Sequence, residues 1–178
     1  MTIIETTTYS KCRLKASPDL DHGEDNNLSL STSVNANVLL LNICSNGTLS
    51  RHGFYAKVSS IIVDASIPVS LFLTSDRRIS IAVDARQVTT DPDLTIVQKR
   101  LSDYGVVTVS DHLAILSITL PSTGAGGDRS AFRIVSALSA CGIESEMVSY
   151  GATQPTISCM LRKEDVSRAL ETLNSVSM

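Results

Sequence analysis

Two short polar groups in this chain could take part in chemistry. His52 and Gly53 stand at the expected start of a helix, where the imidazole could donate to a ligand or act as a general acid or base near neutral pH. Asp76, Arg77 and Arg78 fall in an expected hairpin turn, where arginine suits bidentate contact with a carboxylate and could polarise a carbonyl. Each group also has a simpler interpretation, as an ordinary loop histidine and as a solvated hairpin tip.

The other polar motifs give no recognisable catalytic or metal site. The glycine-rich stretch at 121–128 lacks the Lys-Ser/Thr of a P-loop and any GxGxxG spacing, and we interpret it as a flexible loop. Glu144 and Glu146 flank Ser145 and could form a carboxylate pair, although a solvated strand face is the simpler interpretation. No Ser/His/Asp or Cys/His arrangement is legible, and we expect neither a metal nor a cofactor.

Composition limits the class of protein. Hydrophobic residues make up 43% of the 178 residues, and aromatic residues only 4%, so an aliphatic core is expected. The formal net charge of −3 gives no reason to expect nucleic acid or an anionic membrane as a partner. Cys44, Cys141 and Cys159 stand in apolar runs and are predicted to be small core residues. Neither a membrane-helix run nor a signal pattern occurs, so a cytoplasmic chain is expected.

The elements that must position these residues occur twice. Residues 57–83 are echoed by residues 133–161, with Ile67 aligned to Ile143 at an offset of 76 residues. Each copy predicts a strand, a helix, a strand, a turn and a strand, followed by a second helix. We therefore expect an α+β chain of two tandem ferredoxin-like βαββαβ domains, each an antiparallel sheet with two helices on one face.

Hydrophobic periodicity predicts the elements. Apolar runs predict strands at 28–34, 38–43, 69–73, 79–83, 105–109, 113–120, 143–149 and 156–161. Helical spacing predicts one helix that opens at Gly53 and buries Phe54, Val58, Ile61, Ile62 and Ala65. Further helices are predicted from Asp91, after Asp128 and over 166–176.

The same patterns predict the domain boundaries. The polar residues 1–27 are expected to be a flexible arm, and residues 38–110 the first domain. Residues 28–37 together with 111–178 are expected to form the second domain. The strands are apolar on both faces, so bare faces or edges are expected to pair with each other or with a second copy of the chain.

Two segments of the chain resemble a known family. SNGTLSRHGFYAKV and IPVSLFLTSDRRISIAVD resemble the first ACT domain in the regulatory half of aspartokinases, especially the fungal type. GIESEMVSYGATQPTISCML and EDVSRALETLNS resemble the second, and the likeness covers about 28–177. The amino-acid kinase domain that precedes these modules in the family is absent from this sequence, so we expect no aspartate kinase activity.

The resemblance implies a fold and a ligand site. In the family the two ACT domains lie side by side in a continuous sheet, and here residues 28–34 would join the second domain. The family senses free lysine or threonine between its ACT domains, with the ligand carboxylate on the amides of a loop and helix start. The matching ligand-binding positions here are Thr48, Arg51, His52, Gly53, Phe54, Tyr55, Ser70, Thr74, Ser75, Asp76 and Arg77.

Several positions depart from the family pattern. Ser70 stands where the family has a carboxylate that holds the effector's ammonium, and Arg77 stands at a usually hydrophobic position. The family's GASExN becomes GATQPT at 151–156. Tyr55 replaces an aliphatic residue and could point its hydroxyl into the pocket or lie at an interface. The altered site suggests a different ligand, such as an acid without the amine, or no ligand.

Three functions are compatible with these observations. The first is a free-standing, homodimeric ACT-domain pair that binds a small carboxylate or amino-acid-like ligand and regulates a partner, such as a kinase or biosynthetic enzyme. The alternative is a repurposed small enzyme of specialised metabolism, a cyclase or isomerase, with His52, Tyr55, Asp76 and Arg77 as catalytic candidates. The third is a dimerising structural remnant that contacts another protein through its sheet edges.

Overall fold

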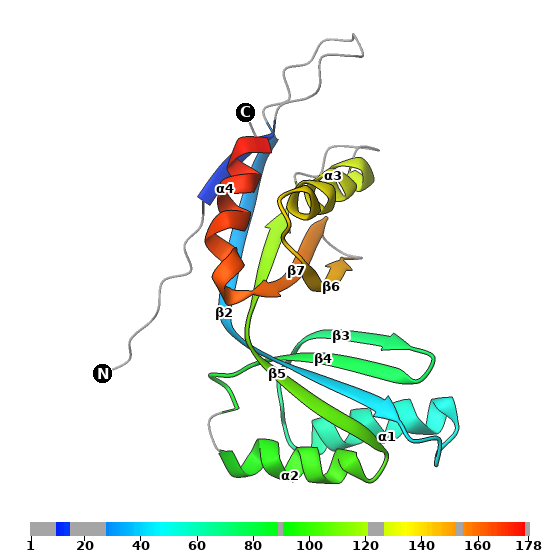
Figure 1. The fold of residues 1–178 in the computed structure, drawn as a ribbon. Helices are drawn as coiled ribbons and strands as arrows, with labels where there is room; N and C mark the ends of the chain where they lie inside the picture. Colours follow the sequence, from blue (N-terminus) through cyan, green and yellow to red (C-terminus); the bar gives the residue numbers. More distant parts are fainter. Residues whose placement is uncertain (1–9, 15–27, 89–90, 121–126, 152–154, 177–178) are drawn as a thin grey trace. The chain divides into compact units, whose positions relative to one another are not determined.

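The structure is a computed structural model that describes residues 10–14, 28–88, 91–120, 127–151 and 155–176. The chain divides into two compact units, Asn37–Leu113 and Met1–Ala36 with Ala114–Met178. Two long strands, β2 (Leu28–Ser45) and β5 (Gly105–Thr119), pass from one unit into the other (Figure 1). We call Asn37–Leu113 the central unit and the remainder the terminal unit.

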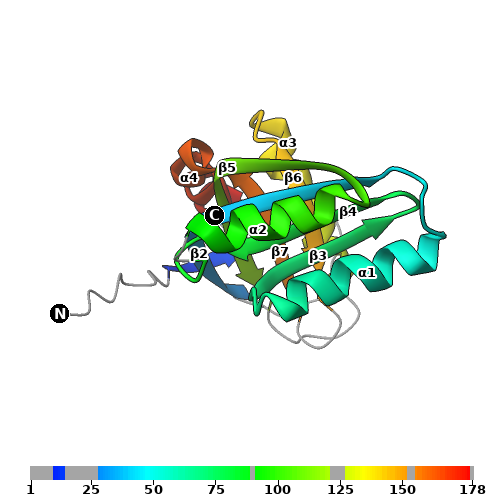
Figure 2. The same cartoon turned by 90° about the horizontal axis from the view of Figure 1, so that it is seen from below.

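The central unit is a four-stranded sheet with two helices. Its elements are the second part of β2, α1 (Arg51–Asp64), β3 (Val69–Ser75), β4 (Arg78–Asp84), α2 (Asp91–Ser102) and the first part of β5. The strand order is β3-β4-β2-β5, and the β2–β4 and β3–β4 pairs are antiparallel. Both helices lie on the same face of this sheet (Figure 2).

Packing against the sheet explains where α1 lies. Phe54, Val58, Ile61 and Ile62 recur at helical spacing and are buried, which confirms the predicted face. Their partners on the strands and α2 include Leu41, Ile43, Ile79, Ile81, Val83, Val97 and Leu101. The helix begins at Arg51 and not at Gly53, because the Ser50 side chain caps it by accepting from the Gly53 amide at 3.3 Å.

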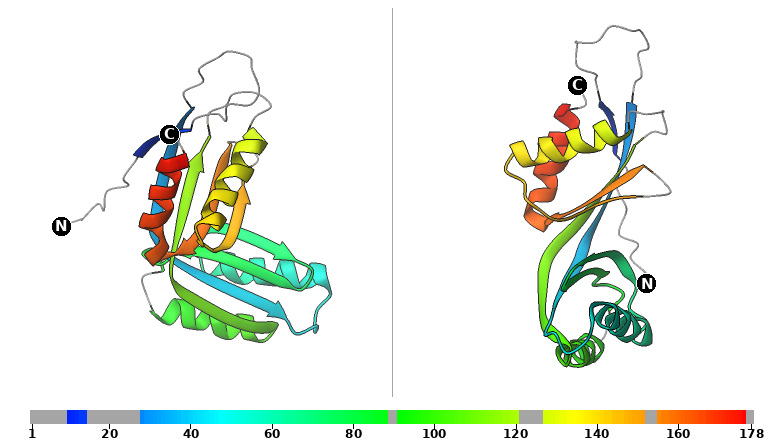
Figure 3. Two further views of the ribbon diagram at one scale, coloured as in Figure 1. Left: turned by 45° about the horizontal axis from the view of Figure 1, so that its top comes forward. Right: turned by 90° about the vertical axis from the view of Figure 1, so that its right-hand side faces the viewer.

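The terminal unit repeats this plan. It contains β1 (Ser10–Leu14), the first part of β2, the end of β5, α3 (Gly127–Ala140), β6 (Ser145–Tyr150), β7 (Thr156–Arg162), the short 3₁₀ helix η2 (Lys163–Asp165) and α4 (Val166–Val176). Its strand order is β2-β5-β7-β6, and β1 pairs with β2. The helices α3 and α4 lie on one side of the sheet (Figure 3), over a core that includes Leu116, Ile118, Ile134, Leu138 and Leu173.

The predicted fold class is confirmed. Each unit has the ferredoxin-like strand order, with two helices on one face of its sheet. In the terminal unit, the strand that completes the sheet precedes the central unit in sequence, because it is the first part of β2. Within the described ranges, no helix is long and apolar enough to cross a membrane.

Several element boundaries differ from the prediction. The strands predicted at 28–34 and 38–43 form one strand, and so do those predicted at 105–109 and 113–120. His112 adopts a left-handed φ of 56° inside β5 without ending the strand. No strand was predicted within residues 1–27, but β1 pairs with Leu28–Thr32 of β2 there. Because this short polar strand is stabilised by pairing with β2, its own sequence carries no pattern that would predict it.

The predicted core cysteines are only partly correct. Cys159 is buried, whereas Cys44 and Cys141 are exposed. Cys44 alternates with the buried Ile43 along β2 and therefore faces the other side of the sheet. Cys141 follows the last residue of α3, beyond the buried face of that helix. The glycine-rich stretch at 121–126 and residues 152–154 of the GATQPT segment lie outside the described residues.

Candidate functional site

A hollow of about 270 Å³ opens where α1 begins. We call it the α1-start hollow. It lies within the central unit, between the end of β2, the first turn of α1 and the β3–β4 turn. Its lining residues are Ser45, Gly47, Leu49, Ser50, Arg51, Phe54, Asp76 and Arg77.

The loop that leads into α1 is held by its own polar groups. The Thr48 amide and hydroxyl both donate to Asn46 Oδ1, at 3.1 and 2.7 Å. Asn46 Nδ2 donates in turn to the Asp103 carbonyl at 3.1 Å. Gly47 takes a left-handed φ of 82°, which glycine adopts without strain. Thr48 is therefore occupied in shaping the loop, and the loop presents the start of α1 to the hollow.

The first turn of α1 supplies donors. The Ser50 hydroxyl accepts from the Gly53 amide and the Ser50 carbonyl from the Phe54 amide, at 3.3 and 2.8 Å. The amides of Arg51 and His52 lie in the first turn, where no intrahelical acceptor exists. Since α1 has no acidic residue in its own first turn, the positive end of the helix dipole stays uncompensated by the helix itself.

The charged side chains of the hollow leave a surplus of positive charge. Arg51 Nη1 lies 3.3 Å from Asp76 Oδ1, and both side chains are more than half exposed. Such a pair contributes at most about 1 kcal/mol. The Arg77 guanidinium has no hydrogen-bond or ionic partner among the described residues. Two guanidinium groups therefore face one carboxylate, an arrangement that attracts an anion.

Tyr55 ties α1 to the β3–β4 turn. Its hydroxyl donates to the Ser75 carbonyl at 2.5 Å, with a longer contact of 3.5 Å to the Asp76 carbonyl. The Ser45 amide donates to the Arg77 carbonyl at 2.8 Å, which fixes the turn from the β2 side. Tyr55 does not line the hollow, but together these two bonds hold Asp76 and Arg77 beside the helix start.

The structure brings some of the predicted ligand-binding residues together and separates others. Arg51, Phe54, Asp76 and Arg77 line the hollow. His52 is exposed and outside the lining, and Thr74 and Ser75 lie at the end of β3. Ser70 stands near the start of β3, so it lies about 16 Å along the strand from the turn. The lining also includes Ser45, Gly47, Leu49 and Ser50, of which Ser50 carries a sequence signal as a helix-capping serine three residues before Gly53.

No observation supports the enzyme alternative. Of its four candidates, only Asp76 and Arg77 line the hollow, and both are exposed. The Tyr55 hydroxyl is engaged by backbone carbonyls, and no cluster of three metal-binding side chains exists within the described residues.

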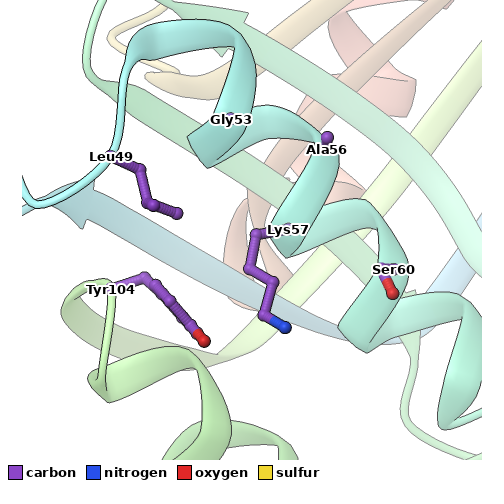
Figure 4. Close-up of a pocket in the computed structure, with 6 residues that line it drawn as sticks. All are labelled: Leu49, Gly53, Ala56, Lys57, Ser60 and Tyr104. Atoms are coloured by element: carbon purple, nitrogen blue, oxygen red, sulfur yellow. The ribbon is translucent and has the colours of Figure 1, made fainter.

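A second, larger hollow of about 450 Å³ lies on the other flank of α1 (Figure 4). We call it the α1-flank hollow. Its lining residues are Leu49, Gly53, Ala56, Lys57, Ser60 and Tyr104. Lys57 Nζ lies 5.4 Å from the centroid of the Tyr104 ring, within cation–π range. Leu49 is the one residue that lines both hollows.

Sequence comparisons place the chain among known proteins. The profile of an ACT domain matches residues 130–176. The chain is 32% identical over 149 residues to the aspartate kinase FUB3 of Fusarium oxysporum, a match that covers 81% of this chain and 26% of that protein. It is 27% identical over 142 residues to the aspartokinase of Saccharomyces cerevisiae, covering 78% and 26%. The chain thus spans about a quarter of the length of these relatives.

Solved structures agree with the sequence comparisons. A C-terminal regulatory domain of aspartate kinase from Porphyromonas gingivalis superposes with a TM-score of 0.69 and 26% identity, covering 84% of this chain and 97% of that one. The regulatory subunit of aspartate kinase from Thermus thermophilus has a TM-score of 0.67, 16% identity and coverages of 82% and 95%. Escherichia coli aspartokinase III, solved with lysine and aspartate, has a TM-score of 0.67, 23% identity and coverages of 87% and 35%. The T. thermophilus and E. coli structures, at 16% and 23% identity, show that this chain has the same fold as they do.

Residues 130–176 match an ACT domain, and both units have the ferredoxin-like strand order of such domains. Over 81% of its length the chain is similar to an aspartate kinase, and the part of its relatives that it matches is the regulatory region. The resemblance stated from the sequence is therefore confirmed.

Proposed function

We propose that this chain is a regulatory module that binds a small carboxylate or amino-acid-like ligand in the α1-start hollow and thereby controls a partner enzyme. The observation that carries the proposal is the α1-start hollow, with its helix-start amides and with Arg77, which has no partner among the described residues. The relationship to aspartokinase regulatory domains supports it. The E. coli relative was solved with lysine and aspartate, which makes these amino acids natural first ligands to test.

The charges of the hollow favour an anion over a zwitterion. A ligand carboxylate would find the first-turn amides and the Arg77 guanidinium. A ligand ammonium would find only Asp76, whose carboxylate is already in contact with Arg51. Ser70 stands far along β3 and carries no charge. We therefore expect acids without an amine to bind more tightly than the corresponding amino acids.

Ligand-dependent stabilisation tests this proposal. Thermal unfolding would be followed with lysine, threonine and aspartate. The amine-free counterparts are 3-hydroxybutyrate for threonine and succinate for aspartate. A ligand at one hundred times its Kd stabilises the folded state by about 2.7 kcal/mol. Arg77→Ala should reduce the shift, whereas Arg133→Ala, at an exposed arginine of α3, should leave it unchanged. The proposal fails if none of these compounds shifts the Tm at millimolar concentration, or if Arg77→Ala responds like the unchanged protein.

One further variant separates the two ligand classes. Asp76→Asn removes the only carboxylate in the lining. Binding of an amine-free acid should tighten, because a competing negative charge is lost, while binding of an amino acid should weaken. Isothermal titration of succinate and aspartate to this variant would measure both changes, and weaker succinate binding would contradict this account.

The edge strand β3 supports the proposal that the chain is a homodimer. Val69, Phe72 and Leu73 are 41, 45 and 49% exposed, and no charged residue occurs along the strand. Charges normally protect such an edge from pairing, and the opposite edge strand β6 carries Glu146. Antiparallel pairing of β3 with its copy would cover these side chains. Sedimentation should show a dimer that Phe72→Lys dissociates and that Phe132→Lys, at a 74% exposed site on α3, leaves intact.

Regulation of a partner requires its own assay. The activity of a full-length aspartokinase from the same source would be measured with and without this chain and its ligand. A ligand-dependent change in activity that Arg77→Ala removes would support the proposal. Binding without any effect on the kinase would exclude that enzyme as the partner.

A further inference from the structure

The α1-flank hollow is an open depression on the surface of the central unit. It is built from three segments: Leu49 before α1, one face of α1, and Tyr104 in the turn between α2 and β5. Its volume of about 450 Å³ falls within the size range of ligand pockets, which are mostly apolar with a few polar groups. Figure 4 shows Leu49 and Tyr104 projecting from their loops toward the Lys57 side chain.

Small residues of α1 keep this hollow open. Gly53, Ala56 and Ser60 recur at helical spacing with Lys57 and share one face of the helix. A methyl group on Gly53 would lie 3.2 Å from Ser50 Oγ and 3.7 Å from Leu49 Cβ. A larger side chain on this face would therefore fill the space that now separates the helix from Leu49 and Tyr104.

The charged group of the α1-flank hollow is the Lys57 ammonium. The Lys57 ammonium is held 5.4 Å from the Tyr104 ring centroid and has no acidic partner among the described residues. The other polar side-chain groups of the lining are the hydroxyls of Ser60 and Tyr104, both able to donate. The lining thus presents donors and a positive charge but no carboxylate.

We propose that the α1-flank hollow binds a small monocarboxylate with an apolar body. The carboxylate lies against Lys57, and the body covers Leu49, Ala56 and the Tyr104 ring. An apolar helix of a partner protein fits less well, because it would bury the Lys57 ammonium without a counter-charge. This site differs from the α1-start hollow, whose charged residues are Arg51, Asp76 and Arg77, although Leu49 lines both.

Titration of the ¹⁵N-labelled chain with benzoate tests the proposal. The amide signals of Gly53, Ala56, Lys57, Ser60 and Tyr104 should shift together and saturate, whereas neutral benzamide of the same shape should shift them little. Lys57→Gln should weaken benzoate binding about three- to fivefold, the loss expected for one exposed charge contact. Lys99→Gln, an exposed lysine of α2, is the matched control and should change nothing.

A second variant addresses the cavity and not the charge. Ala56→Leu adds an aliphatic branch on the exposed face of α1, so it should block benzoate without unfolding the chain. The proposal is overturned if benzamide binds as well as benzoate, or if Lys57→Gln and Ala56→Leu both bind benzoate normally. Shifts confined to Arg51, Asp76 and Arg77 would also overturn it, while leaving the proposed function of the α1-start hollow intact.

Discussion

Gly105→Ala should test how closely β2 and β5 approach each other. Gly105 is buried at the start of β5. A Cβ atom there would overlap the carbonyl oxygen of Cys44 and lie 3.0 Å from its carbonyl carbon and 3.3 Å from Ile43 Cγ2. The obstacle is the backbone of an inner strand of the sheet, so no side-chain rotation relieves it, and the two strands must separate locally.

The cost follows from this separation. Overpacking that shifts backbone costs about 1–3 kcal/mol. The hydrogen bond from the Asn46 amide to the Tyr104 carbonyl, 3.1 Å long, adjoins Gly105 and would lengthen, which adds about 1 kcal/mol. A total of about 2–4 kcal/mol corresponds to a fall in Tm of about 4–16 °C for a chain of this size.

Thermal and urea unfolding followed by circular dichroism would measure the loss. Gly47→Ala is the control, because Gly47 has a φ of 82° and open space within 4 Å, so only backbone strain of about 1 kcal/mol opposes the methyl group. A Gly105→Ala protein that unfolds with the Tm of the unchanged chain, or that loses less than Gly47→Ala, would refute the reasoning. Ser45 and Tyr104 flank the contact, so the same substitution should also disturb both hollows.

Two further predictions concern the terminal unit. Burial raises the pKa of the Cys159 thiol from 9.0 to about 11, against a hydrogen bond with Ser145 that lowers it, so the unfolded state ionises first. Stability should therefore fall as pH rises from 9 toward 11, by at most about 3 kcal/mol, and Cys159→Ala should remove that dependence in urea titrations. Asp165, 5% exposed, accepts from Arg168 at 2.9 Å and Arg162 at 3.2 Å, so Asp165→Ala should lower the free energy of unfolding by about 1–3 kcal/mol. Glu164→Ala, at a side chain 74% exposed, should stay within about 0.5 kcal/mol of the unchanged chain, and equal losses in both variants would contradict this account.

The sequence predicts strongly periodic elements well and interrupted ones poorly. The buried face of α1 and the alternation of Ile79, Ile81 and Val83 both follow from local spacing, and both are confirmed. The continuity of β2 through residues 35–37 could not be predicted, because two asparagines there have the composition of a break. The strand β6 begins at Ser145 and not at the predicted Ile143, because the Ile143 amide donates to the Leu138 carbonyl at the end of α3.

The residues of the candidate site could be predicted only where they stand close together in the sequence or match the motifs of the family. Arg51, Phe54, Asp76 and Arg77 line one hollow, and their binding of a ligand stays a proposal. The bond from Tyr55 to the Ser75 carbonyl could not be predicted, because it depends on the angle at which α1 crosses the hairpin. The α1-flank hollow depends on Tyr104 meeting Lys57, a contact across 47 residues that no local pattern signals.

The helix starts of this chain differ in a way that bears on function. The η2–α4 start has its own acids, Glu164 and Asp165, and Asp165 is buried there with two arginines around it. In contrast, α1 has no acid in its first turn, and the carboxylate in the hollow beside it, Asp76, comes from a hairpin turn and is 78% exposed. An acid in the first turn would stabilise α1 by about 0.3–1 kcal/mol. Its absence, beside Arg77, which has no partner among the described residues, is the reason why we propose the α1-start hollow as an anion site.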